Sequence, residues 1–295
     1  MQFIQSSVLN RSLSPLGIGG MPFSFEGADA SPAVEVWHQA FELGYNVINT
    51  ADCYAPSAAE FGHNERLVGE AVRSAEMGRE AITVITKNGL RRHEADWWRD
   101  NTPEYLVSAA ERSAEQLGFV PDSILLHRLN REQSLPHAIE GLMQARERGF
   151  TNSIGVSNVN REELLVAWEA SGHSLAFVEN EQSPRYRFHR DVLELCDELG
   201  IVYLAWSPLG GAGEAARLGE LHPEFASVAA RHGVSAQQIA LAWLRSLSPW
   251  VLPIPAFTRF ATAQDSWSSL EIHLSAEDLE LLNSREVGPS PTYPE

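Results

Sequence analysis

The sequence predicts an α/β fold, a parallel (β/α)8 TIM barrel formed by a single domain that spans residues 1–295. Apolar, strand-like segments alternate with amphipathic, helical segments eight times along the chain, which is typical of this barrel. No linker or change of composition separates the repeating units. Polar residues also end strand after strand, whereas an open, doubly wound sheet concentrates its site at one switch point. The doubly wound sheet is therefore the less favoured alternative.

The expected strands are short apolar or β-branched runs, and helices with an apolar face follow them. Strands are expected at residues 13–21, 45–49, 81–87, 122–128, 151–158, 175–183, 201–211 and 250–256. Helices are expected at residues 31–43, 64–73, 102–117, 136–148, 161–170, 191–199, 223–232 and 235–247. The last segment, residues 274–295, begins with an acidic helix, and we expect it to cover the barrel or to form a loose tail.

Glycine and proline mark the boundaries of these elements in order. The first strand ends in glycines, which allow a backbone to approach a ligand closely. Pro32 and Pro103 stand at the start of their helices, where no N–H hydrogen bond is lost. Gly44 and Gly200 end the helices that precede the second and seventh strands. The boundaries therefore agree with the strand–helix alternation.

Composition and charge narrow the class of protein. The 295 residues include 22 Lys plus Arg and 39 Asp plus Glu, a formal net charge of −17 that repels nucleic acids and anionic lipid. Cys53 and Cys196 are too few for a disulfide framework and suit a reduced compartment. No signal peptide or apolar run of about 20 residues is apparent. We expect a cytoplasmic protein that binds a small molecule and neither nucleic acid nor membrane; no metal site is assigned, and the oligomeric state stays open.

Three chemically active side chains follow or end separate strands of the predicted barrel. They are Tyr54, Lys87 and His127. Each alone is more typical of packing or of a solvated strand end, but strand ends of a barrel converge on one face, so we expect them to meet. A tyrosine, whose ordinary pKa is about 10, donates a proton more readily when an ammonium stabilises its phenolate, and an imidazole can orient a carbonyl oxygen between them. The trio predicts protonation of an oxygen during carbonyl reduction.

The later strand ends offer groups suited to a nucleotide cofactor. Ser157 and Asn158 suit a carboxamide, Glu179 could accept from its nitrogen, and Trp206 offers a face for a flat heteroaromatic ring. An ordinary loop with a core tryptophan is the alternative interpretation. Groups for the phosphates are expected around Ser207, Leu209, Gly210, Thr258 and Arg259, and Thr262 and Asp265 follow as further cofactor-binding candidates. Gly20 and Met21, at the glycine-rich end of the first strand, are expected to approach the cofactor closely.

These motifs resemble the aldo-keto reductases, barrel oxidoreductases that use NAD(P)H without a Rossmann domain. The resemblance runs through LGIGGM, ITK, LLHR, IGVSN, WSPLGG and LPIPA to LSAEDLELLN, in order and at the expected strand ends. It implies that Tyr54 is the proton donor, with Lys87 and His127 as its partners. It also implies that Ser157 and Asn158 bind the carboxamide and that Trp206, where the family usually has tyrosine, stacks on the nicotinamide.

The sequence departs from the family pattern at two positions near the proposed reaction centre. The family's aspartate, five residues before the tyrosine, is Asn49 in N-T-A-D-C-Y. An amide can hydrogen-bond Lys87 but cannot form an ion pair with it, and Asp52 is a candidate substitute that an extended backbone would point away. The family's glutamine near the nicotinamide is Glu179, a carboxylate that would favour the oxidised, positively charged cofactor.

The phosphate-binding segment departs as well. Family members usually have an arginine near Thr262 and Glu-Asn where Asp265-Ser266 stand. Arg259 is expected to take over the 2′-phosphate, since a guanidinium binds phosphate in a bidentate manner. NADP is therefore the expected cofactor and NAD the alternative.

The leading expectation is an oxidoreductase that interconverts a carbonyl and an alcohol with NADP(H). Two alternatives stay open: a non-redox acid–base catalyst of dehydration or cyclisation, suggested by Asn49 and Glu179, and a nucleotide-binding sensor module. The sequence leaves the substrate unassigned. Expected pocket walls are Phe23, Phe25, Trp97, Trp98 and Tyr293.

Overall fold

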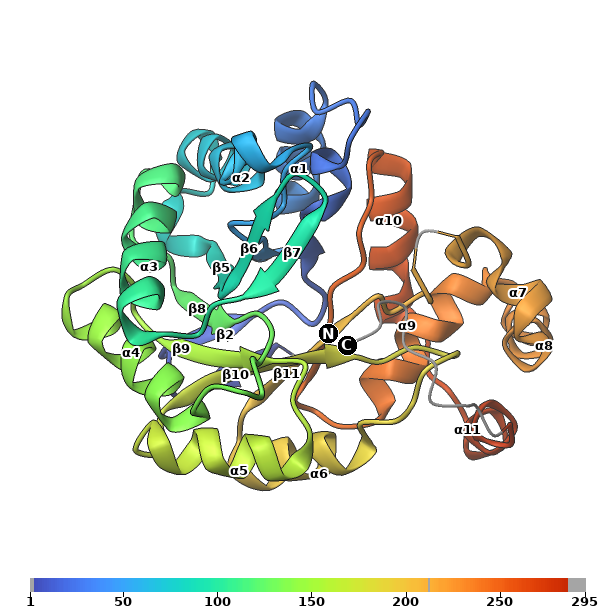
Figure 1. The fold of residues 1–295 in the computed structure, drawn as a ribbon. Coiled ribbons are helices and arrows are strands. Elements are labelled where there is room, and N and C mark those ends of the chain that lie inside the picture. The colour runs from blue at the N-terminus through green and yellow to red at the C-terminus, as the bar shows by residue number, and fades with distance from the viewer. Residues whose placement is uncertain (1–2, 212, 286–295) are drawn as a thin grey trace.

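Parallel strands form the centre of the molecule. The computed structural model of the chain describes residues 3–211 and 213–285. In these residues eight strands form one parallel sheet in the order β12-β11-β10-β9-β8-β5-β4-β3 (Figure 1). Their bounds are β3 Ile18–Gly19, β4 Val47–Asn49, β5 Thr83–Asn88, β8 Ser123–Leu126, β9 Ile154–Ser157, β10 Leu175–Glu181, β11 Val202–Trp206 and β12 Val251–Pro253. Each lies inside or within one residue of an expected strand.

Backbone hydrogen bonds close this sheet into a barrel. The Gly17 N–H donates to the Pro253 carbonyl at 2.9 Å, and the Gly19 N–H donates to the Pro255 carbonyl at 3.0 Å. A parallel bridge also joins Gly19 to Ala256, so the first strand lies beside the last. A closed barrel leaves no unpaired edge, which confirms the predicted (β/α)8 architecture.

Helices surround the barrel and cover its outer surface (Figure 1). Those that follow the strands are α1 Ala33–Leu43, α2 His63–Ser74, α3 Pro103–Leu117, α4 Leu135–Glu147, α5 Arg161–Ala170, α6 Arg190–Leu199, α7 Leu218–Leu221, α8 Pro223–His232, α9 Ala236–Ser246 and α10 Phe260–Ser268. Local sequence sets their ends: capping boxes begin α5 and α9, and Gly44 ends α1 in a left-handed conformation with φ 115°. Helix α10 was not predicted, because its polar sequence was interpreted as a loop.

A short hairpin closes the amino-terminal end of the barrel. It consists of β1 Ile4–Ser6 and β2 Arg11–Leu13. Leu13 is fully buried in one cluster with barrel-interior side chains such as Ile85 and Phe177. Arg11 also forms an ion pair with the buried Asp122 at 3.1 Å, just before β8. The expected first strand, residues 13–21, is thus divided between this hairpin and β3.

A second hairpin lies at the opposite end of the barrel, where β5 ends (Figure 1). It consists of β6 Leu90–His93 and β7 Asp96–Arg99, and the sequence patterns did not predict it. Gly89, with φ 110°, allows the chain to turn out of β5, and its carbonyl accepts from the Asp100 N–H at 3.0 Å. Trp97 and Trp98 keep 49% and 41% of their surfaces exposed here.

The chain beyond β12 packs on the outside of the barrel. Helix α11, Ala276–Asn283, lies against α8, where Arg231 Nη2 is 2.9 Å from Asp278 Oδ1. The expected cover over the barrel depends on residues 286–295, which lie outside the described residues, as does Tyr293. Phe23 is 1% exposed and packs edge to face on Trp37, so it belongs to the core and not to a pocket wall.

Candidate active site

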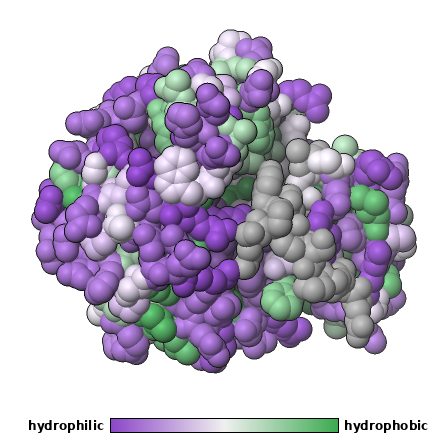
Figure 2. Space-filling model, in the orientation of Figure 1, coloured by the Kyte–Doolittle hydropathy of each residue, from purple (hydrophilic) through white to green (hydrophobic). Residues whose placement is uncertain are grey.

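The expected catalytic residues lie at the carboxyl ends of neighbouring strands, on the face that carries the β6–β7 hairpin. Asn49 ends β4, Lys87 lies near the end of β5 and His127 follows β8. Because β4, β5 and β8 are adjacent in the sheet, these residues come together in space. Figure 2 shows that this face is mainly hydrophilic, with apolar side chains visible in a recess near its centre.

The Lys87 ammonium is buried and meets three acceptor groups. Its Nζ donates to Asn49 Oδ1 at 2.5 Å and to the Thr50 carbonyl oxygen at 2.9 Å. It also pairs with the Glu179 carboxylate, whose Oε1 and Oε2 lie 3.1 Å and 3.3 Å away. An ammonium carries three protons, so these three groups match its hydrogen-bonding capacity. The buried charge is therefore paired and hydrogen-bonded, as burial requires.

Tyr54 lies beside Lys87 in the loop between β4 and α2. Its backbone N–H donates to the Ala51 carbonyl at 3.2 Å, and its carbonyl accepts from the Asn64 N–H at 3.1 Å. The side chain is half-buried, and Lys87 Nζ lies 5.2 Å from the centroid of its ring. A positive charge at this distance favours the phenolate form of the tyrosine over the neutral form.

His127 is buried next to Tyr54. The two rings meet edge to face with centroids 5.8 Å apart, and His127 Nδ1 lies 3.4 Å from the Cys53 sulfur. Burial, followed by the positive charges of Lys87 and Arg128, holds the pKa of His127 well below its ordinary value of 6.5. The imidazole is therefore neutral at pH 7, with one ring nitrogen protonated to donate a hydrogen bond.

Asp52 and Glu65, two further buried carboxyl groups of this region, are bonded away from the lysine. Asp52 Oδ2 accepts from Asn88 Nδ2 at 2.9 Å, and Glu65 Oε1 accepts from a threonine hydroxyl at 2.6 Å. Burial raises the pKa of both groups, and the charge of Glu65 raises that of Asp52 further. Asp52 thus does not replace the family's aspartate as the partner of Lys87; within the described residues, Glu179 provides the carboxylate that contacts it.

The residues expected to bind a carboxamide and a flat ring form one group at the ends of β9 and β11. Asn158 Nδ2 donates to Ser157 Oγ and to the His127 carbonyl, both at 2.9 Å, and its Oδ1 accepts from Trp206 Nε1 at 3.2 Å. Asn158 has a left-handed backbone with φ 59°, a conformation that recurs at functional sites. Trp206 remains partly exposed.

Glu179 connects this group to Lys87. Its backbone carbonyl accepts from Ser157 Oγ at 2.7 Å and from the Asn158 N–H at 3.0 Å. Its side chain, 2% exposed, accepts from Asn49 Nδ2 at 2.7 Å while it pairs with Lys87. The residues expected to hold the cofactor and those expected to move the proton therefore belong to one network.

Gly20 and Met21 lie beside Asn49. The Gly20 N–H donates to the Asn49 carbonyl at 2.8 Å, and a Cβ added at Gly20 would lie 2.7 Å from Asn64 Oδ1. The close approach of Asn64, whose Nδ2 donates to the Gly20 carbonyl at 2.9 Å, explains the glycine. Met21 begins the 3-10 helix Met21–Ser24 and is half-buried.

The turn after β11 and the start of α10 offer groups suited to phosphate. Ser207 and Gly210 have left-handed backbones with φ 47° and 88°, and the Gly210 N–H donates to the Ser207 carbonyl at 2.8 Å. Leu209 anchors this turn by packing against the core. Arg259 is exposed at the amino-terminal end of α10, which no side chain caps. Helix amino termini and guanidinium groups both bind phosphate, so these residues fit a dinucleotide.

The other candidates of this segment have different surroundings. Thr258 is exposed just before Arg259, and Thr262 lies in the first turn of α10, where its N–H donates to the Arg259 carbonyl at 3.1 Å. Asp265 accepts from Ser235 Oγ at 3.4 Å, a contact that ties α10 to α9. The side chain of Asp265 therefore contacts α9 and helps to hold α10 in place.

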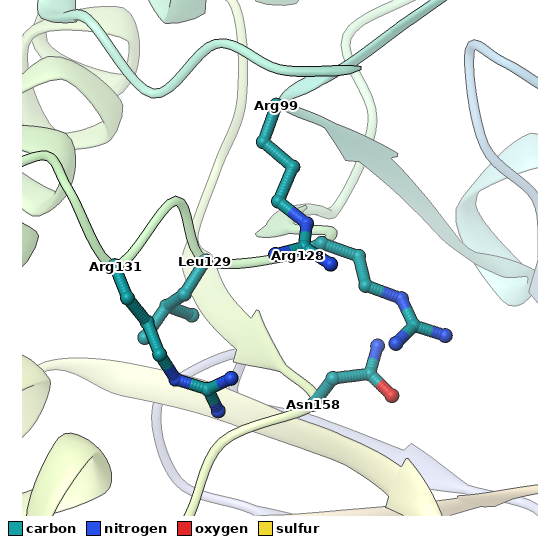
Figure 3. A pocket seen from close by; sticks show the side chains of 5 residues that line it. All are labelled: Arg99, Arg128, Leu129, Arg131 and Asn158. Carbon is teal, nitrogen blue, oxygen red and sulfur yellow. The ribbon is translucent and has the colours of Figure 1, made fainter. Parts of the chain in front are cut away.

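A small pocket lined by arginines opens beside Asn158. Its lining residues are Arg99, Arg128, Leu129, Arg131 and Asn158. Figure 3 shows their side chains gathered around Asn158 from the end of β7 and from the loop after β8. Sequence reasoning did not single out this pocket, because the arginines come from separate segments that only the fold brings together.

Sequence reasoning also treated Asn49 and Glu179 separately and missed their direct contact. A signal was present, since an amide stands where the family has a carboxylate and a carboxylate stands where it has an amide. The Thr50 carbonyl and the Cys53 thiol gave no such signal, because their contacts depend on the packing of a loop.

Across residues 3–211 and 213–285, no group of three or more His, Cys, Asp or Glu side chains is arranged to hold a metal ion. In that part of the chain, no helix combines the length and apolar character that crossing a membrane requires.

Solved structures of aldo-keto reductases match nearly the whole chain. The thermostable aldo-keto reductase Tm1743, in complex with the inhibitor epalrestat, is 26% identical with a TM-score of 0.78, and the match covers 96% of this chain and 98% of that one. An aldo/keto reductase from Klebsiella pneumoniae in complex with NADP and acetate has a TM-score of 0.80 at 23% identity, with 100% and 98% covered. The latter likeness establishes the shared fold.

Sequence relatives agree with these structures. Pyridoxine 4-dehydrogenase of Escherichia coli (strain K12) is 28% identical, over 92% of this chain and 95% of the relative. The 6-dehydroglucose reductase of Novosphingobium aromaticivorans is also 28% identical, over 90% of each. The family model described as Aldo/keto reductase family matches residues 15–286. The chain therefore belongs to the Aldo/keto reductase family.

Proposed function

We propose that the chain interconverts an aldehyde or ketone and the corresponding alcohol by hydride transfer with NADP(H). The observation that carries this proposal is the meeting of Tyr54, Lys87 and His127 at one end of the barrel. Lys87 Nζ lies 5.2 Å from the Tyr54 ring centroid, and the His127 ring centroid lies 5.8 Å from it. A phenol, an ammonium and a neutral imidazole together suit protonation of a carbonyl oxygen.

Each member of the trio has a separate task in this proposal. In the direction of reduction, Tyr54 donates the proton to the substrate oxygen. The charge of Lys87 stabilises the phenolate that remains, which eases the transfer. His127 is neutral, because burial and the neighbouring cations lower its pKa, so its N–H orients the substrate oxygen without competing as an acid.

NADP(H) supplies or accepts the hydride when it is bound. Ser157 and Asn158 would hold its carboxamide, and Trp206 would provide the face for its ring. The turn at Ser207 and Gly210 would receive the pyrophosphate, and Arg259 at the start of α10 the 2′-phosphate. Arg259 is the reason for proposing NADP over NAD, and the related K. pneumoniae structure is a complex with NADP.

The contact between Asn49 and Glu179 favours redox chemistry over the non-redox alternative. That alternative was suggested by Asn49 and Glu179 as departures from the family pattern. Both side chains instead bond to Lys87 and to each other. The reason for a separate acid–base function is thereby removed, and the trio gives no support to a pure sensor module, which needs no proton donor.

The proposal is tested by following the absorbance of reduced nicotinamide with a panel of aldehydes and ketones. We expect substrate-dependent oxidation of NADPH, and we expect Tyr54→Phe to lower kcat by about 10²–10⁴-fold, the contribution of a positioned proton donor. NADPH binding should remain, because Tyr54 is not among the proposed cofactor ligands. A Tyr54→Phe variant with the full rate, or product formed without any change in the cofactor, would contradict the proposal.

We further propose that residues 1–295 act as a single domain in the cytoplasm. Cys53 and Cys196 are buried free thiols, which suits a reducing compartment. Cell fractionation and a single cooperative unfolding transition would support this; a second transition or secretion would contradict it.

A further inference from the structure

We propose that Asn49 and Glu179 form one functional unit, in which Glu179 is the positioning residue that holds Lys87 and Asn49 orients the pair. The proposal rests on the function proposed above for Lys87. In this proposal the carboxylate that pairs with the lysine comes from Glu179 on β10, next to Asn49, and not from the end of β4.

The orientation of the Asn49 amide follows from its two neighbours. Its Oδ1 faces the Lys87 ammonium at 2.5 Å, and its Nδ2 faces Glu179 Oε2 at 2.7 Å. The reverse orientation would place an NH2 group against an ammonium and a carbonyl against a carboxylate. Asn49 thus connects the cation and the anion in the only orientation that satisfies both.

The identities of these two residues depend on one another. An aspartate at position 49 would place a second carboxylate oxygen about 2.7 Å from Glu179, and like charges that close cannot both ionise. A glutamine at position 179 would leave Lys87 with two neutral acceptors, Asn49 and the Thr50 carbonyl. The network therefore accepts one carboxylate and one amide.

Alternative carboxylates do not explain the pairing of Lys87. Asp52 is bonded to Asn88, and Glu65 to a threonine hydroxyl. Within the described residues, Glu179 makes the ion pair with Lys87, and both side chains are almost fully buried, at 3% and 1% exposure. A buried cation that loses such an anionic partner keeps its desolvation cost, so Glu179 should matter for both stability and catalysis.

A swap of the two side chains tests the proposal. The variants are Glu179→Gln, Asn49→Asp and the double variant, with Glu224→Gln as a control, since Glu224 is a buried carboxylate near cations at the outer helix α8. We expect Glu179→Gln to lower kcat at least about tenfold and to move the alkaline limb of its pH profile to lower pH. An unpaired buried ammonium loses its proton more readily, and an unmasked one favours the inactive phenolate, so both effects have the same sign.

The double variant provides the decisive comparison. It restores one carboxylate and one amide, so we expect kcat and the alkaline limb to return to within about threefold and half a pH unit of wild type. The double variant should also recover the melting temperature that the single variants lose. This measurement tests the Asn49–Glu179 unit even if the enzyme reduces none of the substrates. Glu224→Gln should leave the pH profile unchanged.

Two results would overturn the proposal. One is a Glu179→Gln variant with wild-type kcat and pH profile; the other is a double variant whose losses are the product of the single losses. If Glu179→Gln does not fold, kcat and thermal stability of the double variant are compared with those of Asn49→Asp. A double variant no better than Asn49→Asp in both would overturn the proposal. A wild-type enzyme without carbonyl reduction, but with rescue of thermal stability by the swap, would refute the proposed function and leave the unit intact.

We also infer, from a separate observation, that the substrate carries a carboxylate or phosphate that binds in the arginine pocket. The pocket brings Arg99 and Arg128 together beside Asn158 (Figure 3). Within the described residues the Arg99 guanidinium has no hydrogen bond or ion pair. Arg131, by contrast, donates to Glu163 at 2.8 Å.

The position of this pocket links it to the reaction centre. Arg128 follows His127 in the chain, and its charge contributes to lowering the pKa of that histidine. Asn158 belongs both to the pocket and to the proposed carboxamide site. Two guanidinium groups that line one pocket of an otherwise acidic protein are expected to attract an oxyanion. Carboxylates and phosphates bind a guanidinium in a bidentate manner.

Matched substrates test this inference, which also rests on the proposed reductase function. We expect a higher kcat/KM for 4-carboxybenzaldehyde than for its methyl ester, and for glyceraldehyde 3-phosphate than for glyceraldehyde, in at least one pair. The pair that responds identifies the anion. Arg99→Gln should lower kcat/KM of the preferred anionic substrate about tenfold through KM, with the neutral partner within about twofold; Arg231→Gln, on the outer helix α8, is the control.

Equal kcat/KM within both pairs, or an equal effect of Arg99→Gln on both members, would overturn the inference. If no aldehyde is reduced, calorimetric binding of 4-carboxybenzaldehyde to the NADPH-loaded wild type and to Arg99→Gln separates the two proposals. Weaker binding to the variant supports the subsite, and equal or undetectable binding contradicts it.

Discussion

Asn49 and Glu179 are both departures from the family pattern, yet together they provide Lys87 with one carboxylate and one amide. Considered singly, Asn49 suggests a weakened reductase and Glu179 a bias toward the oxidised cofactor. Considered together, the charge of Glu179 is balanced by Lys87, so its effect on the nicotinamide should be smaller than that of an isolated carboxylate. The effect of either residue therefore depends on the other.

His127 gives a prediction about stability and pH. Burial and the nearby cations lower its pKa below 6.5 in the folded protein, so the unfolded chain takes up a proton first as pH falls. Its contribution to stability is therefore present above about pH 6.5 and is lost below it, by up to about 1.4 kcal/mol per pH unit. The free energy of unfolding of wild type minus that of His127→Gln should fall as pH decreases through this range.

Chemical denaturation across a pH series measures that difference. Leu165→Ala provides the control, because this exposed side chain has no titratable group and its difference should not change with pH. A constant difference for His127→Gln would show that the imidazole takes up its proton equally in both states.

The sequence predicted that the proposed catalytic trio would meet at one end of the barrel, which the structure shows, but it did not predict the local partners of Lys87. Tyr54, Lys87 and His127 were recognisable because each stands at or after a strand end, and strand ends of a barrel converge. The partners of Lys87 on β10 and in the loop after β4 depend on side-chain directions that strand spacing does not determine. Charge complementarity between positions 49 and 179 was the available clue.

At the scale of elements, the loops and helices after β11 and β12 determine the proposed cofactor specificity. The segment from residue 256 onward was interpreted as a phosphate loop, and most of it is helix α10. Its polar sequence and lack of a strong apolar face conceal the helix, because only Ala263 and Ser266 are buried. The helix supports phosphate binding here, because Arg259 lies at a helix amino terminus that no side chain caps.

Arg259→Gln should weaken the binding of NADPH. A charged hydrogen bond to phosphate contributes about 1.5–3 kcal/mol, so we expect Kd for NADPH to rise about 10–100-fold. Binding of NADH, which lacks the 2′-phosphate, should change less than about threefold. Fluorescence titration of both cofactors measures the two values, and an equal loss for NADH and NADPH would place Arg259 away from the 2′-phosphate.

The two hairpins were missed for a common reason. Strands β1, β2, β6 and β7 have three or four residues each, too few for an alternating pattern to stand out. Charged residues and tryptophans also occupy β6–β7, whose side chains are mostly solvent-exposed. Such elements are stabilised by their place on the barrel, which only the fold provides.

At the scale of the whole molecule, the barrel separates stability from chemistry. The β1–β2 hairpin and the interior apolar cluster lie at the amino-terminal end and in the middle, and the residues proposed to react lie at the carboxyl ends of the strands. This separation allows loops and hairpins on one face to vary without loss of the core. It also explains why the alternating pattern predicted the fold while leaving the substrate unassigned.

Leu13→Ala tests that separation. Leu13 is fully buried, so its truncation should lower the free energy of unfolding by about 2–5 kcal/mol. Because it lies far along the barrel from the strand ends, kcat below the unfolding transition should stay close to wild type. Leu165→Ala, at a side chain 39% exposed, should cost no more than about 0.5 kcal/mol. A large loss of kcat with unchanged stability in Leu13→Ala would contradict the separation.

Isotope transfer from the cofactor tests the central claim most directly. NADPH carrying deuterium at the transferable position of nicotinamide C4 would be incubated with the enzyme and a reducible aldehyde, and the product analysed by mass spectrometry. Hydride transfer predicts an alcohol with one deuterium on the former carbonyl carbon, and a rate that falls by about 10²–10⁴-fold in Tyr54→Phe. Product that forms without the deuterium would contradict the proposed reaction.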